Sequence, residues 1–128
     1  MIIDPRSVDA STCYKILVNV IVPRPIAFVS TISTTGVPNV APFSFFNAFC
    51  GDPPIVGFAP NNNPPKDTLV NARDTGEFVV NIVTEEIAEQ MNLTAKRYPP
   101  EVNEFEIAKL TAAPSQIVRA PRVLESPV

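Results

Sequence analysis

The stretch PNVAPFSFFN, residues 38–47, decides how the whole sequence is interpreted. It starts with the alternation of a β-strand, contains two prolines, and then places Ser44 and Asn47 around the aromatic pair Phe45 and Phe46. Two interpretations stay open, because buried polar groups cost free energy unless they are hydrogen-bonded. Either the polar side chains turn toward solvent at a strand end, or a planar ligand lies against this backbone and bonds to them. The prolines favour an edge strand, which leaves backbone groups free for such a ligand.

Length and composition indicate one soluble globular domain over residues 1–128. Hydrophobic residues make up 45% of the 128 positions and charged residues 18%, which favours a folded core over disorder. The net charge of −3 argues against a nucleic-acid partner, which would need a basic stripe. No apolar run follows a basic start, and the apolar stretch 16–32 is interrupted by Pro23, Arg24 and Pro25. We therefore expect a cytoplasmic protein without a membrane span.

The residues that are missing limit the chemistry. There is no histidine, so the chain cannot build a Ser-His-Asp or Cys-His nucleophilic site. Cys13 and Cys50 form no CxxC pair and are interpreted as reduced thiols, so we expect neither a redox disulfide nor a metal site. The four glycines form neither GxGxxG nor a phosphate loop. If the protein is an enzyme, we expect a bound cofactor to carry its chemistry.

The pattern of apolar residues predicts a mainly β protein. Four segments have the alternating or β-branched character of strands: 26–33, 39–46, 55–60 and 77–83. Between the first two, the turn at 34–38 has Gly36 free to adopt positive φ, so these strands should form an antiparallel hairpin. Strands and helices follow one another without a regular βαβ alternation, which favours an antiparallel barrel with added helices.

Helices are expected in three places. The first covers 7–19 with its apolar side chains inward, namely Tyr14, Ile16, Leu17 and Val18. The second begins after Asp67 as its N-cap and ends before Gly76. The third covers 84–94, where Thr84 caps the start and acidic residues favour the first turn.

The last part of the chain, 95–128, has a less regular pattern. Residues 103–110 predict one or two helical turns, and 115–128 predict the approach to a further strand. About thirty mostly irregular residues are unusual at the end of a compact domain.

Two basic residues are candidates for binding an anion. Lys66 stands at the start of the second predicted helix, where backbone donors and the helix dipole favour an anion, and Thr68 can add a hydroxyl. The same pattern also fits an ordinary capped surface helix, and we assign Asp67 to capping. Arg24 is held between two prolines and could bind a phosphate or pair with a carboxylate. Thr31 is either a ligand contact or simply a polar residue of its strand.

Taken together, these segments closely resemble the flavin reductase-like domain family, whose members have the FMN-binding split-barrel fold. The resemblance runs from about residue 15 to the last residue and keeps both order and spacing. It rests on five motifs: PRPIAFVST (23–31), GVPNVAPFSFFN (36–47), DPPIVGFAP (52–60), KDTLVNARDTGEFVVNIV (66–83) and PRVLESPV (121–128).

The resemblance implies a Greek-key split β-barrel, usually dimeric, with FMN (or FAD) bound near the subunit interface. It implies that the isoalloxazine is cradled by Ser44, Phe45, Phe46 and Asn47. It also implies that the ribityl phosphate faces Lys66 and Thr68, with Arg24 and Thr31 as helpers. Members of the family run on for several strands after a PRVLESPV-like segment, so we expect an incomplete barrel with an open edge in this 128-residue chain.

The resemblance further implies reduction of flavin by NADH or NADPH, often to supply reduced flavin to a partner monooxygenase. Some relatives instead pass electrons without such a partner, so a non-catalytic FMN-binding electron carrier and an inactive truncated remnant stay open as alternatives. The expected activity agrees with the absence of histidine, because hydride transfer to a flavin needs stacking and orientation but no protein nucleophile.

Overall fold

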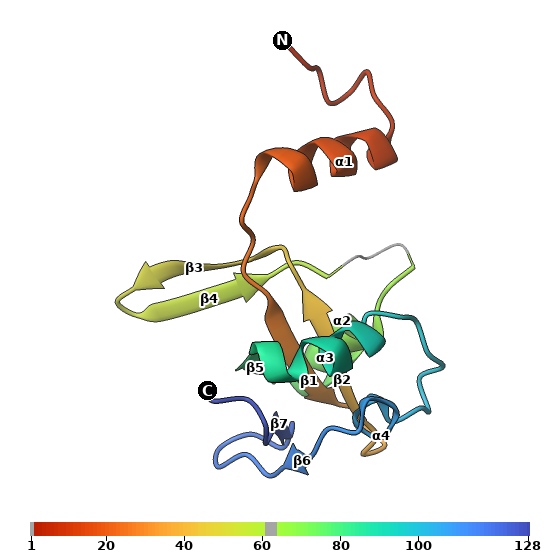
Figure 1. Cartoon of the computed structure of the whole chain (residues 1–128), viewed down its shortest axis with the longest axis vertical. Helices are drawn as coiled ribbons and strands as arrows, with labels where there is room; N and C mark the ends of the chain where they lie inside the picture. The colour runs from red at the N-terminus through yellow and green to blue at the C-terminus, as the bar shows by residue number, and fades with distance from the viewer. Residues whose placement is uncertain (1, 61–63) are drawn as a thin grey trace.

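The computed structural model describes residues 2–60 and 64–128, which form strands and helices in mixed order (Figure 1). The strands are β1 (Ala27–Ile32), β2 (Pro38–Phe43), β3 (Phe46–Gly51), β4 (Pro54–Phe58), β5 (Val79–Ile82), β6 (Ala112–Ala113) and β7 (Arg122–Val123). The helices are α1 (Ala10–Val20), α2 (Asp67–Thr75), the short 3-10 helix η1 (Glu85–Ile87), α3 (Ala88–Leu93) and α4 (Glu104–Ala108). The prediction of a mainly β protein with added helices is confirmed.

The centre of the molecule is a three-stranded antiparallel sheet in the order β2-β1-β5. Strand β1 lies in the middle, and its first five residues are buried. The predicted hairpin between β1 and β2 is confirmed, with Ser30 opposite Val40 and with Gly36 at φ 89° in the turn. Helix α2 packs on β1 and β2, while α4 packs on β2.

The predicted strand 39–46 is divided in two by the structure. Strand β2 ends at Phe43, because its partner β1 begins at Ala27 and offers no further pairing. The chain then starts β3, which pairs with β4 in a separate two-stranded hairpin that projects from the central sheet (Figure 1). Ser44 and Phe45 therefore lie in the link between two strands rather than inside one.

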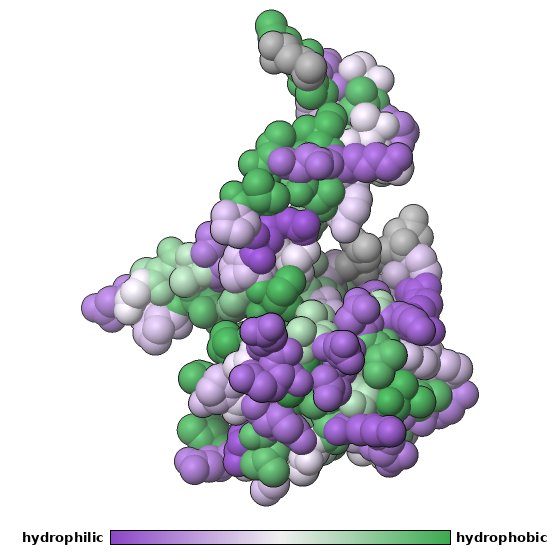
Figure 2. Space-filling model, in the orientation of Figure 1, coloured by the Kyte–Doolittle hydropathy of each residue, from purple (hydrophilic) through white to green (hydrophobic). Residues whose placement is uncertain are grey.

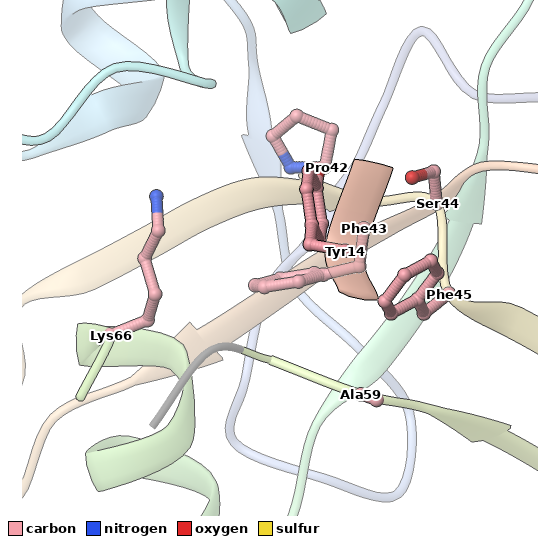
Figure 3. A pocket seen from close by; sticks show the side chains of 7 residues that line it. All are labelled: Tyr14, Pro42, Phe43, Ser44, Phe45, Ala59 and Lys66. Atoms are coloured by element: carbon pink, nitrogen blue, oxygen red, sulfur yellow. The ribbon is translucent and has the colours of Figure 1, made fainter. Parts of the chain in front are cut away.

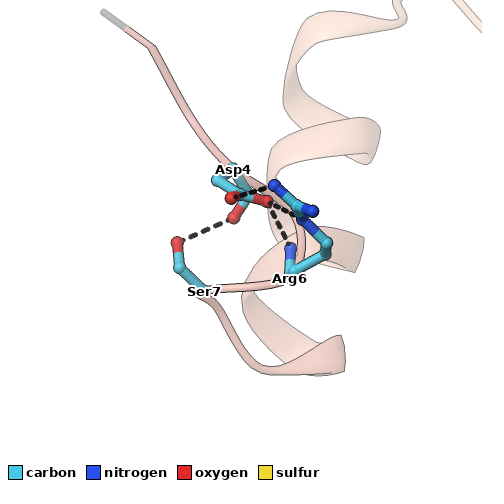
Figure 4. A network of polar contacts seen from close by, with 3 residues as sticks. All are labelled: Asp4, Arg6 and Ser7. Carbon is cyan, nitrogen blue, oxygen red and sulfur yellow. Dashed lines mark hydrogen bonds and ion pairs between the residues drawn. The ribbon is translucent and has the colours of Figure 1, made fainter.

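The expectation that α1 turns its apolar side chains inward is wrong. None of its residues is buried, and the helix stands away from the central sheet (Figure 1), with Tyr14 reaching the ring of Phe45. Its start is determined locally, since the Asp9 carboxylate accepts the Thr12 N–H at 3.0 Å. A turn precedes it in which Arg6 is paired with Asp4 (Figure 4). The amphipathic pattern that predicted burial therefore leaves other apolar side chains of α1 exposed, among them Leu17 and Val20.

Two capping predictions also need correction. Asp67 is the first residue of α2 rather than its N-cap; Lys66 holds that position and no side chain caps the helix. Thr84 does precede η1, but its side chain makes no capping hydrogen bond. The predicted end of α2 is confirmed, because Gly76 adopts φ 75° just after the last turn.

The core consists of two clusters of buried side chains, one on each side of the sheet. The first contains Phe28, Val40, Ile87, Phe105, Ala108, Leu110 and Val123. The second contains Ala27, Val29, Ala41 and Phe43, with Phe46, Phe58 and Val80 packed against it. Over residues 2–60 and 64–128, no helix has both the length and the apolar character needed to cross a membrane.

A buried amide connects the last segment of the chain to the sheet. Asn81 of β5 is 1% exposed, and its amide nitrogen donates to the Phe28 carbonyl at 2.9 Å and to the Ser30 hydroxyl at 3.0 Å. Its oxygen accepts the N–H of Val123 in β7 at 2.8 Å. One side chain thus links β1, β5 and β7, and it gives the irregular segment 95–128 a defined place.

Replacing Asn81 with alanine should destabilise the protein. Asn81→Ala leaves the Val123 N–H and the Phe28 carbonyl without their partner in a buried site, so we expect the free energy of unfolding to fall by about 2–4 kcal/mol. Urea unfolding followed by circular dichroism measures this change. The matched control is Asn92→Ala, at an exposed position of α3. Equal effects of the two substitutions would contradict the role of Asn81.

Candidate functional site

A pocket of about 190 Å³ lies where the end of β2, the link to β3, α1 and the start of α2 meet. Figure 3 shows Lys66 on one side of this pocket and Ser44 and Phe45 on the other. We call it the aromatic pocket, and its lining residues are Tyr14, Pro42, Phe43, Ser44, Phe45, Ala59 and Lys66. Its lining side chains are mostly rings, with the hydroxyls of Ser44 and Tyr14 and the ammonium group of Lys66.

The aromatic wall is supported by Arg24 from the segment between α1 and β1. The Arg24 Nη1 donates to the Ser44 hydroxyl, and the guanidinium carbon lies 5.9 Å from the centre of the Phe45 ring. The Arg24 Nε is buried and has no hydrogen-bond partner among the described residues. Tyr14 contributes the next ring, with its centre 5.8 Å from that of Phe45 and the planes tilted by 54°. The Arg24 cation therefore lies over the Phe45 ring, where it can interact with its electron-rich face.

The β3–β4 hairpin fixes the floor of the aromatic pocket. Ala59 donates its N–H to the Phe45 carbonyl at 2.9 Å, which continues the pairing of Phe46 with Phe58 beyond the strand ends. Phe43 and Phe58 pack with ring centres 5.1 Å apart. The break between β2 and β3 therefore follows from two pairings that meet at this point, and it exposes Ser44 and Phe45 to the pocket.

Lys66 also lines a second, smaller pocket beneath the start of α2. This second pocket is lined by Asn39, Ala41, Lys66, Asp67, Thr68, Lys96, Arg97, Tyr98 and Glu104. Arg97 ties the segment after α3 to the segment before α2, since its Nη2 donates to the carbonyls of Pro64 and Pro65 at 3.1 and 3.0 Å. Lys66 is the residue shared by the two pockets.

The structure brings half of the predicted site residues to the aromatic pocket. Ser44, Phe45 and Lys66 line it, and Arg24 contacts two of these residues. Ser44 and Phe45 therefore have the arrangement expected for a planar ligand, with a ring and a hydroxyl on the same wall. Their role as cofactor contacts stays a prediction.

The other four predicted residues lie elsewhere. Phe46 packs against the second core cluster, and Asn47 is exposed and accepts the Ala48 N–H through its own side chain at 2.9 Å. Thr31 is fully buried, and its hydroxyl accepts from Asn71 of α2 at 3.1 Å. Thr68 is also buried and lines the second pocket. All four have structural partners, and their assignment as cofactor contacts stays untested.

Several lining residues could not be found from the sequence. Pro42, Phe43 and Ala59 line the pocket because two strand pairs end beside one another, and strand ends are set by partners far apart in the chain. Tyr14 comes from a helix that was expected to pack inward. The available signal was the stretch FSFFN, which indicated Ser44, Phe45, Phe46 and Asn47; of these, Ser44 and Phe45 line the pocket.

Glu104 is a buried carboxyl at the edge of the second pocket. It begins α4, is 5% exposed, and its Oε2 accepts the N–H of Val40 at 2.9 Å. The pKa of Glu104 is raised to about 7, chiefly because the carboxyl is buried; Asp67 also raises this pKa, while the Val40 N–H and Lys66 lower it. The charge of this carboxyl therefore changes near neutral pH.

Known proteins with similar sequences and structures agree on one family. The Flavin reductase like domain matches residues 20–128. The structure superposes on nitrilotriacetate monooxygenase component B from Bacillus cereus with a TM-score of 0.90 and 38% identity, covering 98% of this chain and 63% of that one. For 2-nitrobenzoate 2-nitroreductase NbaA from Pseudomonas fluorescens the TM-score is 0.87 and the identity 32%, covering 99% and 61%.

The fold and these matches define a split barrel of the flavin reductase type, whose sheets are not closed into a barrel within the described residues. The chain belongs to the flavin reductase-like domain family. An uncharacterised protein of Aquifex aeolicus is 49% identical to it over 126 residues, which cover 96% of this chain and 64% of that protein. The chain thus spans less than two thirds of the length of each of these three proteins.

Glu104 should make the stability of the protein depend on pH. Because the folded protein holds this proton more tightly than the unfolded chain, stability falls as pH rises from the ordinary pKa of 4.5 to about 7. We expect the contribution to be about 1–3 kcal/mol. Glu104→Gln should remove this part of the slope, which urea unfolding between these pH values measures.

The control for this test is Glu106→Gln, an exposed carboxyl on the same helix. It should keep the slope of the original protein. An unchanged slope in Glu104→Gln would show that Glu104 does not titrate in this range.

Proposed function

We propose that this chain forms the FMN-binding part of an NAD(P)H-dependent flavin reductase. The observation that carries the proposal is the aromatic pocket, in which Phe45 and Tyr14 supply rings, Ser44 a hydroxyl and Lys66 a cation. The pocket lies in a chain of the flavin reductase-like domain family, and its walls offer the kinds of groups that a flavin needs.

The residues fit a flavin in their chemistry. An isoalloxazine is planar and carries polar edges, so it stacks on rings and accepts hydrogen bonds from a hydroxyl or guanidinium. The unpartnered Nε of Arg24 is a buried donor beside the Phe45 ring. Lys66 stands at the N-terminus of α2, where the helix dipole also attracts an anion, so it would hold the phosphate.

The chain's own residues would bind and orient rather than react. Bound flavin supplies the redox chemistry, accepting a hydride from nicotinamide and passing the electrons on. Phe45 and Tyr14 would cover the ring and limit its exposure to water, while Ser44 would hold its polar edge. No residue needs to act as a nucleophile, which suits a sequence without histidine.

The electron acceptor is proposed from the two similar structures. One is component B of a monooxygenase, so we propose that this protein supplies reduced flavin to a partner oxygenase. The other is a 2-nitroreductase, which makes a nitroaromatic compound the second candidate acceptor. Comparing oxidation of NADH or NADPH with free flavin and with 2-nitrobenzoate separates the two candidates.

The proposed function is tested by adding FMN or FAD to the purified protein and then NADH or NADPH under nitrogen. We expect a bound flavin whose visible absorption is bleached by a nicotinamide nucleotide. Bound flavin that neither nucleotide reduces would indicate an electron carrier instead. A protein that binds no flavin would overturn the proposal.

Lys66 should contribute to flavin affinity through its charge. Lys66→Ala removes a charge-assisted contact, so we expect FMN binding to weaken by about 1–3 kcal/mol. Titration followed by quenching of flavin fluorescence measures the dissociation constant. Arg73→Ala is the matched control, because it removes a cation from the last turn of the same helix. An unchanged constant in Lys66→Ala would remove Lys66 from the site.

We also propose that the protein is a homodimer. The aromatic pocket, at about 190 Å³, is smaller than the roughly 300–1,000 Å³ usual for such ligands. Figure 2 shows apolar side chains gathered on α1 and on the β3–β4 hairpin, where Val20 is 68% exposed and Phe49 71%. Contiguous exposed apolar surface of this kind favours an interface. A second subunit would cover both elements and complete the pocket.

The dimer should depend on α1. Leu17→Asp places a charge on its exposed apolar face, so we expect the protein to become monomeric and to bind FMN at least about tenfold more weakly. Light scattering after size-exclusion chromatography gives the mass. Ile117→Asp, at a fully exposed position outside α1 and the hairpin, is the control and should leave the mass unchanged. A monomeric original protein would refute this proposal.

A further inference from the structure

Glu104 is a buried carboxyl that the proposed flavin site does not use. Among residues 2–60 and 64–128, ion pairs join Arg6 to Asp4 and Arg119 to Glu77, and none involves Glu104. A buried carboxyl without an ion-pair partner is costly unless hydrogen bonds or protonation compensate it. Its location beneath the start of α2 therefore calls for a functional explanation.

The hydrogen bonds of Glu104 lead to β2 and, through Asn39, to α2, which are two of the elements around the aromatic pocket. Its Oε2 accepts the Val40 N–H, which belongs to the edge strand β2. In the amide orientation that satisfies both ends of Asn39, the Asn39 nitrogen donates to the same Glu104 oxygen at 3.0 Å. The Asn39 oxygen then accepts the Thr68 hydroxyl at 2.9 Å. Thr68 is the second residue of α2, so Glu104 is connected to β2 directly and to α2 through Asn39.

We propose that Glu104 is a positioning residue for the flavin site, acting through β2 and through the charge of Lys66. Strand β2 leads directly into Ser44 and Phe45, and Lys66 lines both the second pocket and the aromatic pocket. The part of this inference that concerns FMN rests on the proposed function. The part that concerns the position of β2 and Lys66 does not.

Titratable side chains from two segments border the second pocket together with Glu104. These groups are Lys66 and Asp67 at the start of α2, and Lys96, Arg97 and Tyr98 in the segment after α3. Lys66 favours the ionised form of Glu104, while burial and Asp67 favour the neutral form and hold the pKa at about 7. The charge of Glu104 therefore depends on Lys66, which also lines the aromatic pocket.

Binding of a phosphate at Lys66 should favour the protonated form of Glu104. The phosphate pairs with the Lys66 ammonium group and adds negative charge beside Glu104. Both effects disfavour the ionised form of Glu104. By linkage, ionisation of Glu104 must then weaken phosphate binding to the same degree. The dissociation constant of FMN should rise as pH rises through about 7. The greatest possible slope for one linked proton is about tenfold per pH unit.

The test compares the protein with Glu104→Gln between pH 6 and pH 8, a range chosen to be about one unit either side of the expected change. Glutamine can still accept the Val40 N–H but carries no charge. The Glu104→Gln variant should therefore not show the weakening of FMN binding that ionisation of Glu104 causes as pH rises. The ratio of the two dissociation constants is the measured quantity, because the phosphate of FMN ionises identically in both titrations. Riboflavin, which has no phosphate, should give a constant ratio. Glu106→Gln is the control variant and should behave like the original protein.

Glu104→Ala separates positioning from charge. It removes the acceptor of the buried Val40 N–H, so we expect FMN affinity to fall about tenfold at pH 6. Glu104→Gln keeps an acceptor at this position, so its FMN affinity at pH 6 should match that of the original protein. A constant ratio for FMN across the pH range, or equal affinities of the alanine and glutamine variants, would overturn the inference.

A measurement without ligand keeps this inference separate from the proposed function. The backbone amide resonances of Val40 and Lys66 should shift with pH near 7 in the original protein and not in Glu104→Gln. If no FMN binds at any pH, the proposed function fails, and these resonances alone decide whether Glu104 positions β2 and Lys66. A shift that persists in Glu104→Gln would overturn the inference.

Discussion

The hydroxyl groups buried by β1 are the constraint on which the rest of the structure depends. Ser30 and Thr31 lie in the central strand with no exposure, so each needs a hydrogen-bond partner from another segment. Ser30 bonds to Asn81 of β5 and to the Pro121 carbonyl, and Thr31 accepts from Asn71 of α2. These bonds select which segments can lie beside β1. Apolar packing stabilises the core, and the buried polar groups fix its arrangement.

These buried hydrogen bonds explain why one side of the candidate site is anchored to the core and the other side is not. Because Asn71 anchors α2 to β1, the start of α2 is brought beside β2, and Lys66 faces the end of that strand. The opposite wall includes Tyr14 from α1, a helix with no buried residue. A ligand at this site would therefore meet one wall held by the core and another that includes a side chain from a helix with no buried residue.

The sequence predicted those features that are determined locally. The strand β1, the turn at Gly36 and the end of α2 at Gly76 follow from alternation and from positive φ, which neighbouring residues decide. The break after Phe43 and the outward position of α1 depend on strand pairing and on distant packing, so a local pattern could not show them. In the site, the stretch 44–47 was predicted as a whole, and Ser44 and Phe45 line the pocket while Phe46 and Asn47 do not; the lining by Ala59 required the β3–β4 pairing.

The acidic residues beside Lys66 bear on the phosphate contact proposed there, in a protein whose net charge is −3. Asp67 and Glu104 both border the second pocket, and two fixed negative charges there would oppose any anion at the start of α2. Burial keeps Glu104 partly protonated at neutral pH, which leaves Asp67 as the main opposing charge. Because Glu104 is buried, it can accept the Val40 N–H of β2 and also carry less negative charge beside Lys66. An exposed carboxylate at this position would do neither.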